Sequence, residues 1–173
     1  MSARISLDYL PTPRVHYHVP MPEQMLAYSL GYEGISLERY VEMLKAHGIA
    51  AVVDVREHAW SYKKGFSKRP LQERLTSEGI GYVHIKSAGN PSRNRKAGLA
   101  SDQVIARYRE HLDSDPSCLD EVLAEVRRYA AEGGVCLLCF ERKPHDCHRK
   151  VILDRLADYD STLLSLHLAE ESV

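Results

Sequence analysis

The heptapeptide IAAVVDV, residues 49–55, decides the fold of this 173-residue chain. Its run of Ile, Ala and Val is typical of a strand that is buried on both faces, and such strands occur mainly in parallel sheets. A helical pattern precedes it, because apolar side chains recur at helical spacing from Leu37 to Leu44. Ser36 is a suitable N-cap for that helix and Gly48 a suitable stop. A helix followed at once by a buried strand predicts an α/β unit.

The same alternation continues on both sides of this unit. We expect the other strands at AYSL (27–30), IGYVHI (80–85), VCLLCF (135–140) and TLLSLHL (162–168). We expect the other helices at 70–79, 101–113, 117–132 and 148–159, the last with Val151, Ile152, Leu156 and Tyr159 on its apolar side. The predicted fold class is α/β, a three-layer sandwich with a mostly parallel sheet and helices on both faces, which is a Rossmann-like arrangement.

Length and composition favour one compact domain. The chain is 44% hydrophobic and 27% charged, so we expect a single α/β domain over residues 26–173. Residues 1–25 contain four prolines and predict an extended or flexible N-terminal arm, through which a homo-oligomer would form. The sequence has no run of about 18 apolar residues and no apolar signal core, so we expect a cytoplasmic protein with no membrane partner. The four cysteines are then expected to be thiols.

Charge is unevenly distributed along the chain. The formal net charge is -1, but residues 56–96 hold ten Lys and Arg against three acids. Such a segment serves either as a patch for phosphates and nucleic acid or as an ordinary solvated basic face. Both interpretations remain open.

Polar residues follow the predicted strands at the edge where ligands bind in parallel α/β sheets. GYEG (31–34) comes after the first strand, Asp54 and Arg56 end the second, Asn90 follows the third, and CFERKPHDCHR (139–149) follows the fourth. An unpaired carboxylate at the end of an apolar strand is costly. We therefore expect Asp54 to bind Arg56, a backbone N–H or a cation.

The segment 139–149 begins with one half of a C-x-x-C pair, Cys136 and Cys139. That spacing is typical of zinc or redox sites, but strand residues three apart point to opposite faces of a sheet. Cys136 is therefore expected in the core, whereas Cys139 and Glu141 share the other face.

The second half of the segment predicts the start of a helix. Asp146 is a good N-cap, which places Cys147, His148 and Arg149 in the first turn. The positive end of a helix lowers the pKa of a thiol and also attracts a phosphate or carboxylate. A reactive thiol and an anion site are thus two interpretations of one electrostatic arrangement.

A third interpretation is plain packing, in which Cys147 is buried and His148 caps the helix, and a metal ion is the fourth. The metal ion would use Cys139, Cys147 and His148, with His145 or Glu141 as a further ligand. Zinc ligands usually come in pairs at knuckle or helix spacings, and no second C-x-x-C or H-x-x-x-H is present here. We therefore assign no metal ligand from the sequence, see no evident cofactor, and rank a divalent metal at the first three residues below an anion or thiol site.

Five motifs in order carry a resemblance to a known family. They are GYEG-x-SLE from Gly31, DVR from Asp54, S-x-x-x-GFS from Ser61, Y-x-H and then GNP from Tyr82, and LCFE-x5-CHR from Leu138. Between about Ser29 and Leu156 the chain resembles the bacterial and archaeal family called domain of unknown function 488. The resemblance implies an α/β domain with a polar site built from Gly31, Tyr32, Glu33, Asp54, Arg56, Ser61, Glu141, Cys147, His148 and Arg149.

The chain departs from the family pattern at two places. Related sequences often have Pro-x-Ser-Arg after DVR, where this chain has AWSY (59–62), and Ala88 stands in place of a usual Leu. The first difference replaces a cation with an aromatic ring, so the substrate of relatives does not transfer directly. The two aromatic rings of AWSY beside Lys63 and Lys64 suit stacking on a base, but the favoured interpretation of Trp60 is an ordinary anchored loop residue.

Three functions are compatible with these residues. The first is an enzyme that acts on a phosphorylated, nucleotide or nucleic-acid substrate at an anion-accepting site, with Arg56 and Arg149 holding the anion. Its catalytic candidates are Asp54, Glu141, Cys147 and His148, and its substrate-binding candidates are Gly31, Tyr32, Glu33, Arg56, Ser61, Lys64, Asn90 and Arg149.

The other two functions use different chemistry. One is a Cys/His thiol enzyme, as VVDVRE (52–57) resembles the early strand of sulfurtransferase domains, or a metal-dependent enzyme. The other is a non-catalytic nucleic-acid-binding module that uses the basic segment 56–96.

Overall fold

The structure is a computed structural model that describes residues 24–169. Within this range five strands form one sheet: β1 (Met25–Gly31), β2 (Ala51–Asp54), β3 (Gly81–His84), β4 (Val135–Cys139) and β5 (Leu163–His167). Their order is β3-β2-β4-β1-β5, and every neighbouring pair is parallel. The predicted parallel sheet is confirmed, including its last strand.

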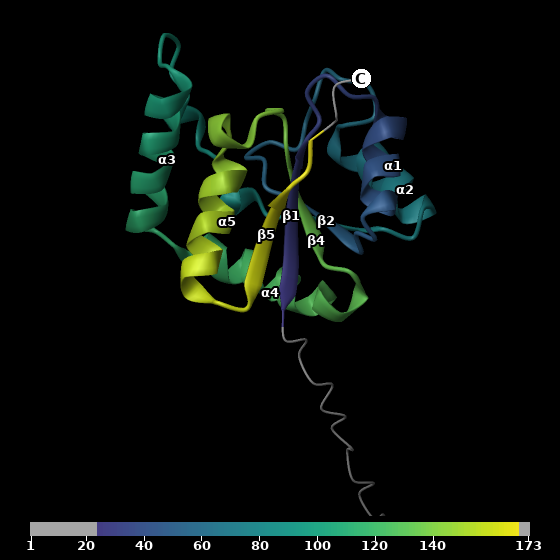
Figure 1. The fold of residues 1–173 in the computed structure, drawn as a ribbon. Helices are drawn as coiled ribbons and strands as arrows, with labels where there is room; N and C mark the ends of the chain where they lie inside the picture. The colour runs from purple at the N-terminus through teal and green to yellow at the C-terminus, as the bar shows by residue number, and fades with distance from the viewer. Residues whose placement is uncertain (1–23, 170–173) are drawn as a thin grey trace, which may run out of the picture.

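Helices connect the strands and cover the sheet. In the described part of the chain the α-helices are α1 (Leu37–Ala46), α2 (Lys68–Ser77), α3 (Ser101–Ser114), α4 (Ser117–Tyr129) and α5 (His148–Tyr159). The short 3₁₀ turns are η1 (Lys86–Ala88), η2 (Ser92–Asn94), η3 (Ala130–Glu132) and η4 (Pro144–Asp146). One face of the sheet packs against α1 and α2 and the other against α3, α4 and α5 (Figure 1). This confirms the three-layer, Rossmann-like α/β fold.

The apolar run of β2 is explained by these two helical layers. Val53 belongs to the core beneath α3, α4 and α5, whereas Val52 belongs to the core beneath α1 and α2. Both side chains are fully buried. A strand in the interior of the sheet therefore needs apolar residues at every position rather than at alternate ones.

Helix α1 begins as predicted, since the backbone N–H of Arg39 donates a hydrogen bond to Ser36 Oγ (3.1 Å). The predicted range of α5, 148–159, is confirmed, but its predicted N-cap is wrong by one residue. Asp146 ends the η4 turn, and Cys147, with extended backbone angles, is the N-cap. The Cys147 N–H donates back to the carbonyl of Pro144 (3.1 Å), which closes the 3₁₀ turn before the helix begins.

Two other expectations need correction or fall outside the described residues. Tyr159 was expected on the apolar side of α5, but it is 63% exposed because the helix ends at this residue, beyond the core. The predicted arm over 1–25 ends earlier than expected, since β1 begins at Met25. The rest of the arm and the oligomer contact assigned to it lie outside residues 24–169.

The four cysteines are buried free thiols, as the composition predicted. Among the described residues, none of the helices combines the length and the apolar character that crossing a membrane requires.

The order of the strands creates a switch point at the carboxyl edge of the sheet. Strand β4 lies between β1 and β2, although the chain forms β2 and β3 before it. The connection after β1 runs to α1 on one face, whereas the connection after β4 runs to α5 on the other. Neighbouring strands whose connections diverge in this way leave room for a ligand above their carboxyl ends.

Candidate functional site

A pocket of about 610 Å³ opens at this switch point. Its volume is within the range of roughly 300 to 1,000 Å³ that is usual for small-molecule sites. Buried Cys139 and His148, together with partly buried Glu141, form its floor, and exposed aromatic side chains form its rim. The pocket is lined by Tyr32, Arg56, Glu57, His58, Trp60, Ser61, Tyr62, Lys63, Asn90, Arg95, Val104, Ile105, Cys139, Phe140, Glu141, Asp146 and His148.

The first buried polar group at this edge is the arginine–carboxylate cluster, which consists of Tyr32, Asp54, Arg56 and Tyr82. Arg56 donates from Nε to Asp54 Oδ1 (2.8 Å) and from Nη2 to Asp54 Oδ2 (2.6 Å). Its Nη1 donates to the Tyr32 hydroxyl (3.0 Å) and to the Phe66 carbonyl (2.8 Å). The Tyr82 hydroxyl donates to Asp54 Oδ2 (2.6 Å). Asp54 therefore has the partner that the sequence predicted.

Burial alone would lower the pKa of Arg56, but the hydrogen bonds and the charge of Asp54 raise it above its ordinary value. Burial and the Asp54 charge also raise the pKa of the Tyr82 hydroxyl well above its ordinary range. The Arg56 guanidinium therefore stays charged, and the Tyr82 hydroxyl keeps its hydrogen for the bond to Asp54.

The second group is the sulfur cluster, which consists of Cys139, Glu141, Cys147 and His148. Glu141 Oε2 lies 3.0 Å from Cys139 Sγ and 3.1 Å from Cys147 Sγ. His148 Nδ1 lies 3.8 Å from each of the same two sulfur atoms. One ligand-type atom from each of the four residues lies within 4.8 Å of all the others.

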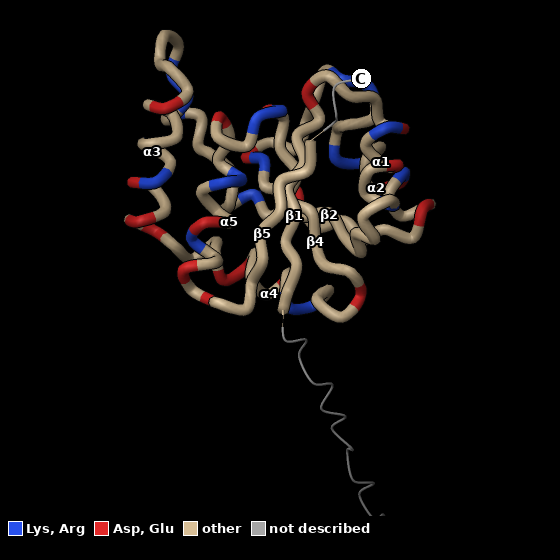
Figure 2. The backbone as a smooth tube through the Cα atoms, in the orientation of Figure 1, with Lys and Arg blue, Asp and Glu red and all other residues tan. Residues whose placement is uncertain are grey.

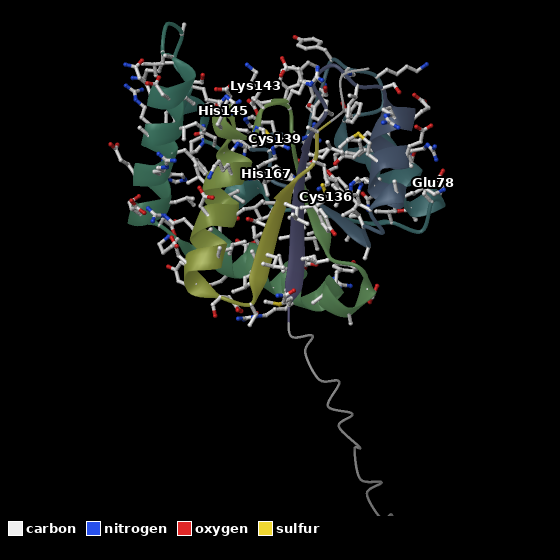
Figure 3. The ribbon with its side chains drawn as sticks, in the orientation of Figure 1. Glu78, Cys136, Cys139, Lys143, His145 and His167 are labelled. Atoms are coloured by element: carbon white, nitrogen blue, oxygen red, sulfur yellow. The ribbon has the colours of Figure 1, made fainter. Side chains whose placement is uncertain are left out.

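Local structure explains why these four side chains meet. Cys139 ends β4, and Glu141 lies two residues further on the same face of the extended chain. The η4 turn then reverses the backbone so that Cys147 and His148 begin α5 beside them. Cys136 points into the opposite core, as predicted, and Figure 3 shows it lower along β4 than Cys139.

Neighbouring groups fix the orientation of this cluster. His148 Nε2 lies 2.7 Å from the Val55 carbonyl. A carbonyl only accepts, so Nε2 carries the hydrogen and Nδ1 is the nitrogen that faces the sulfur atoms. Arg149 donates from Nε to Cys147 Sγ (3.1 Å) and from Nη2 to the Glu141 carbonyl (2.5 Å).

The pKa shifts in the sulfur cluster follow from these contacts. The hydrogen bond with Cys147, together with burial, raises the pKa of the Cys139 thiol well above its ordinary value. Burial alone would raise the pKa of Cys147, but the hydrogen bond with Cys139 and the nearby His148 and Arg149 hold it well below its usual range. Burial raises the pKa of Glu141. The two thiols thus differ in acidity, and Cys147 is the more acidic of the two.

The family of the chain follows from a comparison with family models. The model described as "Domain of unknown function DUF488" matches residues 36–156, which is well over half of the chain. The chain belongs to this family. The resemblance noted from the five motifs is confirmed. Comparisons with curated proteins and with solved structures gave no match.

Half of the site residues predicted for this DUF488 protein line the pocket. They are Tyr32, Arg56, Ser61, Asn90, Glu141 and His148. Asn90 Oδ1 accepts a hydrogen bond from Asn94 Nδ2 (3.1 Å), and Ser61 Oγ accepts one from the Lys63 backbone N–H (3.1 Å). These two side chains therefore shape loops of the wall.

Other predicted residues lie behind the pocket surface. Cys147 is only 1% exposed and lies beneath the floor, together with Arg149. Asp54 is enclosed within the arginine–carboxylate cluster. The guanidinium groups of Arg56 and Arg149, which were expected to hold an anion, donate to groups of the protein itself.

Three predicted residues lie beside the pocket. At Gly31 an added Cβ would collide with the Glu141 carbonyl, so this glycine allows the ends of β1 and the Glu141 loop to approach closely. Glu33 is exposed, and its Oε2 accepts a hydrogen bond from the Arg142 N–H (2.9 Å). Lys64 is exposed and does not line the pocket.

The sequence did not single out several lining residues. Val104 and Ile105 reach the pocket from α3, and their only sequence signal is helical periodicity. Phe140 packs edge-on against the ring of Tyr32 at the rim, with the ring centroids 5.4 Å apart. Only the path of the chain in space brings these side chains to one cavity.

The cations of the basic segment 56–96 are spread over several places and do not all face the pocket. Arg69 and Arg74 lie on α2 and form ion pairs with Glu73 and Glu78, and Figure 2 shows both signs of charge around this helix. Arg56, Lys63 and Arg95 instead line the pocket together with three carboxylates, Glu57, Glu141 and Asp146. The pocket therefore has cations placed among acids rather than one uniformly positive wall.

Proposed function

We propose that this DUF488 protein is an enzyme whose active site is the pocket at the switch point, and that its substrate carries a planar ring and an anionic group. The observation that carries this proposal is the combination, in one cavity, of an exposed aromatic rim with a floor of Cys, Glu and His side chains. A nucleotide, or a phosphorylated compound of similar shape, carries both groups.

The rim supports the ring-binding part of the proposal. Trp60 is 59% exposed, Tyr62 94% and Phe140 45%, so three large rings face water at one opening. These three are half of the large hydrophobic side chains that are exposed among the described residues. Exposed apolar groups that gather in this way mark binding sites, and aromatic rings stack on planar ligands at a gain of about 1 to 3 kcal/mol per base.

The cations near the rim support the anionic part. Lys63 Nζ donates one hydrogen bond to the Tyr32 carbonyl (3.0 Å), and an ammonium group has three donors. Arg95 Nη2 is held by Glu57 Oε2 (2.8 Å) within the same lining. A phosphate or carboxylate of the substrate would bind Lys63 and Arg95 while its ring stacks at the rim.

The floor supplies groups for the reaction. Glu141 is partly exposed, and burial raises the pKa of its carboxyl, which suits a general acid or base. Cys139 and His148 reach the pocket beside it. Cys147 and Arg149 act from beneath the floor by fixing the position and the charge of these groups.

The fluorescence of Trp60 tests this proposal, because Trp60 is the single tryptophan of the chain and lies at the rim. We would titrate the protein with nucleoside monophosphates, with the matching nucleosides and with ribose 5-phosphate. We expect saturable quenching by the nucleotides and weaker binding of ligands that lack either the ring or the phosphate. Quenching that rises linearly and equally for all three ligands would contradict the proposal.

Two lysine variants separate specific binding from general charge effects. Lys63→Ala is expected to weaken the nucleotides and to leave the nucleosides unchanged. Lys68→Ala removes the same charge from an exposed position at the start of α2 and serves as the control. An equal loss of nucleotide binding in both variants would show that long-range charge, and not the pocket, binds the phosphate.

A further inference from the structure

We infer that the sulfur cluster is the binding site of one thiophilic divalent cation, with zinc as the expected ion. Cys139 and Cys147 would each provide a sulfur, Glu141 an oxygen and His148 its Nδ1. The role of the ion in catalysis rests on the proposed function, whereas its binding does not. The site itself follows from the geometry of the four side chains, although their spacing in the sequence is unlike that of common zinc motifs.

The distances fit a tetrahedral ion. Zinc bonds of about 2.3 Å to sulfur and about 2.0 to 2.1 Å to nitrogen, at tetrahedral angles, place the two ligand atoms about 3.6 Å apart. His148 Nδ1 is 3.8 Å from both sulfur atoms. Glu141 Oε2 is 3.0 and 3.1 Å from them, so these two separations would lengthen by about half an ångström around the ion.

The symmetry of these contacts distinguishes an ion from a simple proton. In a thiolate–imidazolium pair, one sulfur approaches the ring nitrogen closely and the second does not need to. Here the nitrogen is equally far from both sulfur atoms, and the carboxylate oxygen is nearly equidistant from them. Four side chains arranged around a common centre match the requirement of a cation with four ligands.

The count of protons also favours a cation. With His148 Nδ1 and Glu141 free of hydrogen, two thiol hydrogens at most serve four sulfur contacts to an oxygen or nitrogen. An ion at the centre would satisfy all four ligand atoms at once. Two thiolates, the Glu141 carboxylate, one divalent ion and the adjacent Arg149 guanidinium then sum to zero net charge, as a buried site requires.

The surroundings resemble the outer shell of a metal site. The ring nitrogen of His148 that faces away from the sulfur atoms lies 2.7 Å from the Val55 carbonyl, which is the common arrangement for a histidine ligand. Arg149 Nε donates to Cys147 Sγ, and N–H donors to thiolates tune the charge on a bound ion. Both contacts hold the ligands in place before an ion binds.

The site faces the pocket on one side. Cys139, Glu141 and His148 line the cavity, whereas Cys147 lies behind them. Glu141 is the most exposed of the four ligands and is therefore the one that a substrate oxygen or water would displace. An ion with such a position acts as a Lewis acid on a carbonyl or phosphoryl oxygen.

The experiment uses the full chain. Protein freed of metal under reducing, oxygen-free conditions is titrated with Co²⁺ and, separately, with Zn²⁺ against a chromophoric chelator. We expect one ion per chain, visible Co²⁺ bands of tetrahedral intensity, and near-ultraviolet absorption from cobalt–thiolate bonds. Absence of stoichiometric binding, or a Co²⁺ spectrum with no thiolate absorption, would overturn the inference without any variant being needed.

Variants assign the ligands. Cys139→Ser and Cys147→Ser are each expected to lose one thiolate contribution and to bind zinc at least tenfold more weakly, about 1.4 kcal/mol or more. Cys118→Ser replaces a buried thiol on α4 outside the cluster and is expected to keep the full spectrum. If Cys118→Ser reduces the thiolate absorption as much as Cys147→Ser does, the assignment is wrong.

The outcome is separable from the test of the proposed function. Nucleotide quenching of Trp60 with no stoichiometric metal would leave the pocket proposal standing and overturn the metal site. Binding of one tetrahedral ion, without specific quenching of Trp60 by nucleotides, would support the metal site and overturn the pocket proposal.

Discussion

The two buried polar clusters of this protein follow neighbouring strands and differ in how their polar atoms are paired. The arginine–carboxylate cluster follows β2 on the side of α1 and α2, and the sulfur cluster follows β4 on the side of α5. In the first, donors and acceptors are matched. In the second, four potential ligand atoms face one another. Burial of polar groups alone does not distinguish a structural cluster from a functional one, but the balance of donors and acceptors does.

The arginine–carboxylate cluster has little capacity left for a ligand. The Asp54 carboxylate accepts from the Arg56 backbone, from two nitrogens of its side chain and from Tyr82. Its role is to join β2 to β3 and to support the wall of the pocket. We therefore expect variants of the arginine–carboxylate cluster to lower the free energy of unfolding more than they weaken ligand binding. Variants of the sulfur cluster should weaken metal binding more than they lower the free energy of unfolding.

The largest expected effect is that of Asp54→Asn. The substitution leaves the Arg56 charge buried without its partner, and breaking a buried ion pair costs about 3 to 5 kcal/mol. Urea denaturation would measure the loss. Asp154→Asn is the control, since its pair with Lys150 is exposed and worth about 0 to 1 kcal/mol. If both variants lose equally little, the cluster is not the structural element that we describe.

The next effect separates the two clusters by zinc. At a free zinc concentration about 100 times the dissociation constant, the wild-type chain gains about 2.7 kcal/mol in the free energy of unfolding. Asp54→Asn should keep this increment on its lower baseline, because its cluster does not contact the ion. Cys147→Ser should lose it. Thermal or urea unfolding of each variant with and without zinc measures this stabilisation. If Asp54→Asn also loses the stabilisation by zinc, the two clusters are coupled.

A smaller effect is expected from Gly31→Ala, which should strain the connection between the strands that bear the clusters. The added methyl group meets the Glu141 carbonyl and displaces the loop, at a cost of about 1 to 3 kcal/mol. The Co²⁺ spectrum should change as well, since Glu141 is displaced. Gly98→Ala also strains the backbone, since Gly98 has a φ of +85°, but its methyl group meets open space and should leave the spectrum intact. An unchanged spectrum in Gly31→Ala would contradict the proposed role of Glu141.

The smallest effect is expected at the surface. Hydrogen bonds from Lys45 and Arg74 lower the pKa of Glu78 from 4.5 to about 2. Because the folded-state pKa is lowered, the stabilisation is present above pH 4.5 and is lost as the pH falls towards 2. Melting temperatures of wild type and Glu78→Gln should therefore differ slightly at pH 7 and converge in acid. Glu110→Gln on α3 controls for the loss of one negative charge, and an equal shift in both would refute a specific pair.

Local rules predicted most of the fold. The apolar run at 49–55, the cap at Ser36 and the alternation in VCLLCF depend on neighbours a few residues apart, and the structure confirms all three. The cap of α5 was misplaced because Pro144 begins a 3₁₀ turn that uses Asp146. Asp146 is compatible both with the end of a 3₁₀ turn and with the N-cap of a helix, and the spacing of residues in the sequence does not decide between the two.

The sequence by itself determined the layers, the parallel sheet and the edge at which polar side chains gather, because periodicity and strand direction are local properties. It also separated Cys136 from Cys139, since alternate residues of a strand face opposite sides. Only the tertiary structure decided which polar groups neutralise one another and which converge. Asp54 is closed off by Arg56 and Tyr82, whereas Cys139 and Glu141 meet Cys147 and His148 after a turn whose exact course depends on packing between β4, α5 and Gly31.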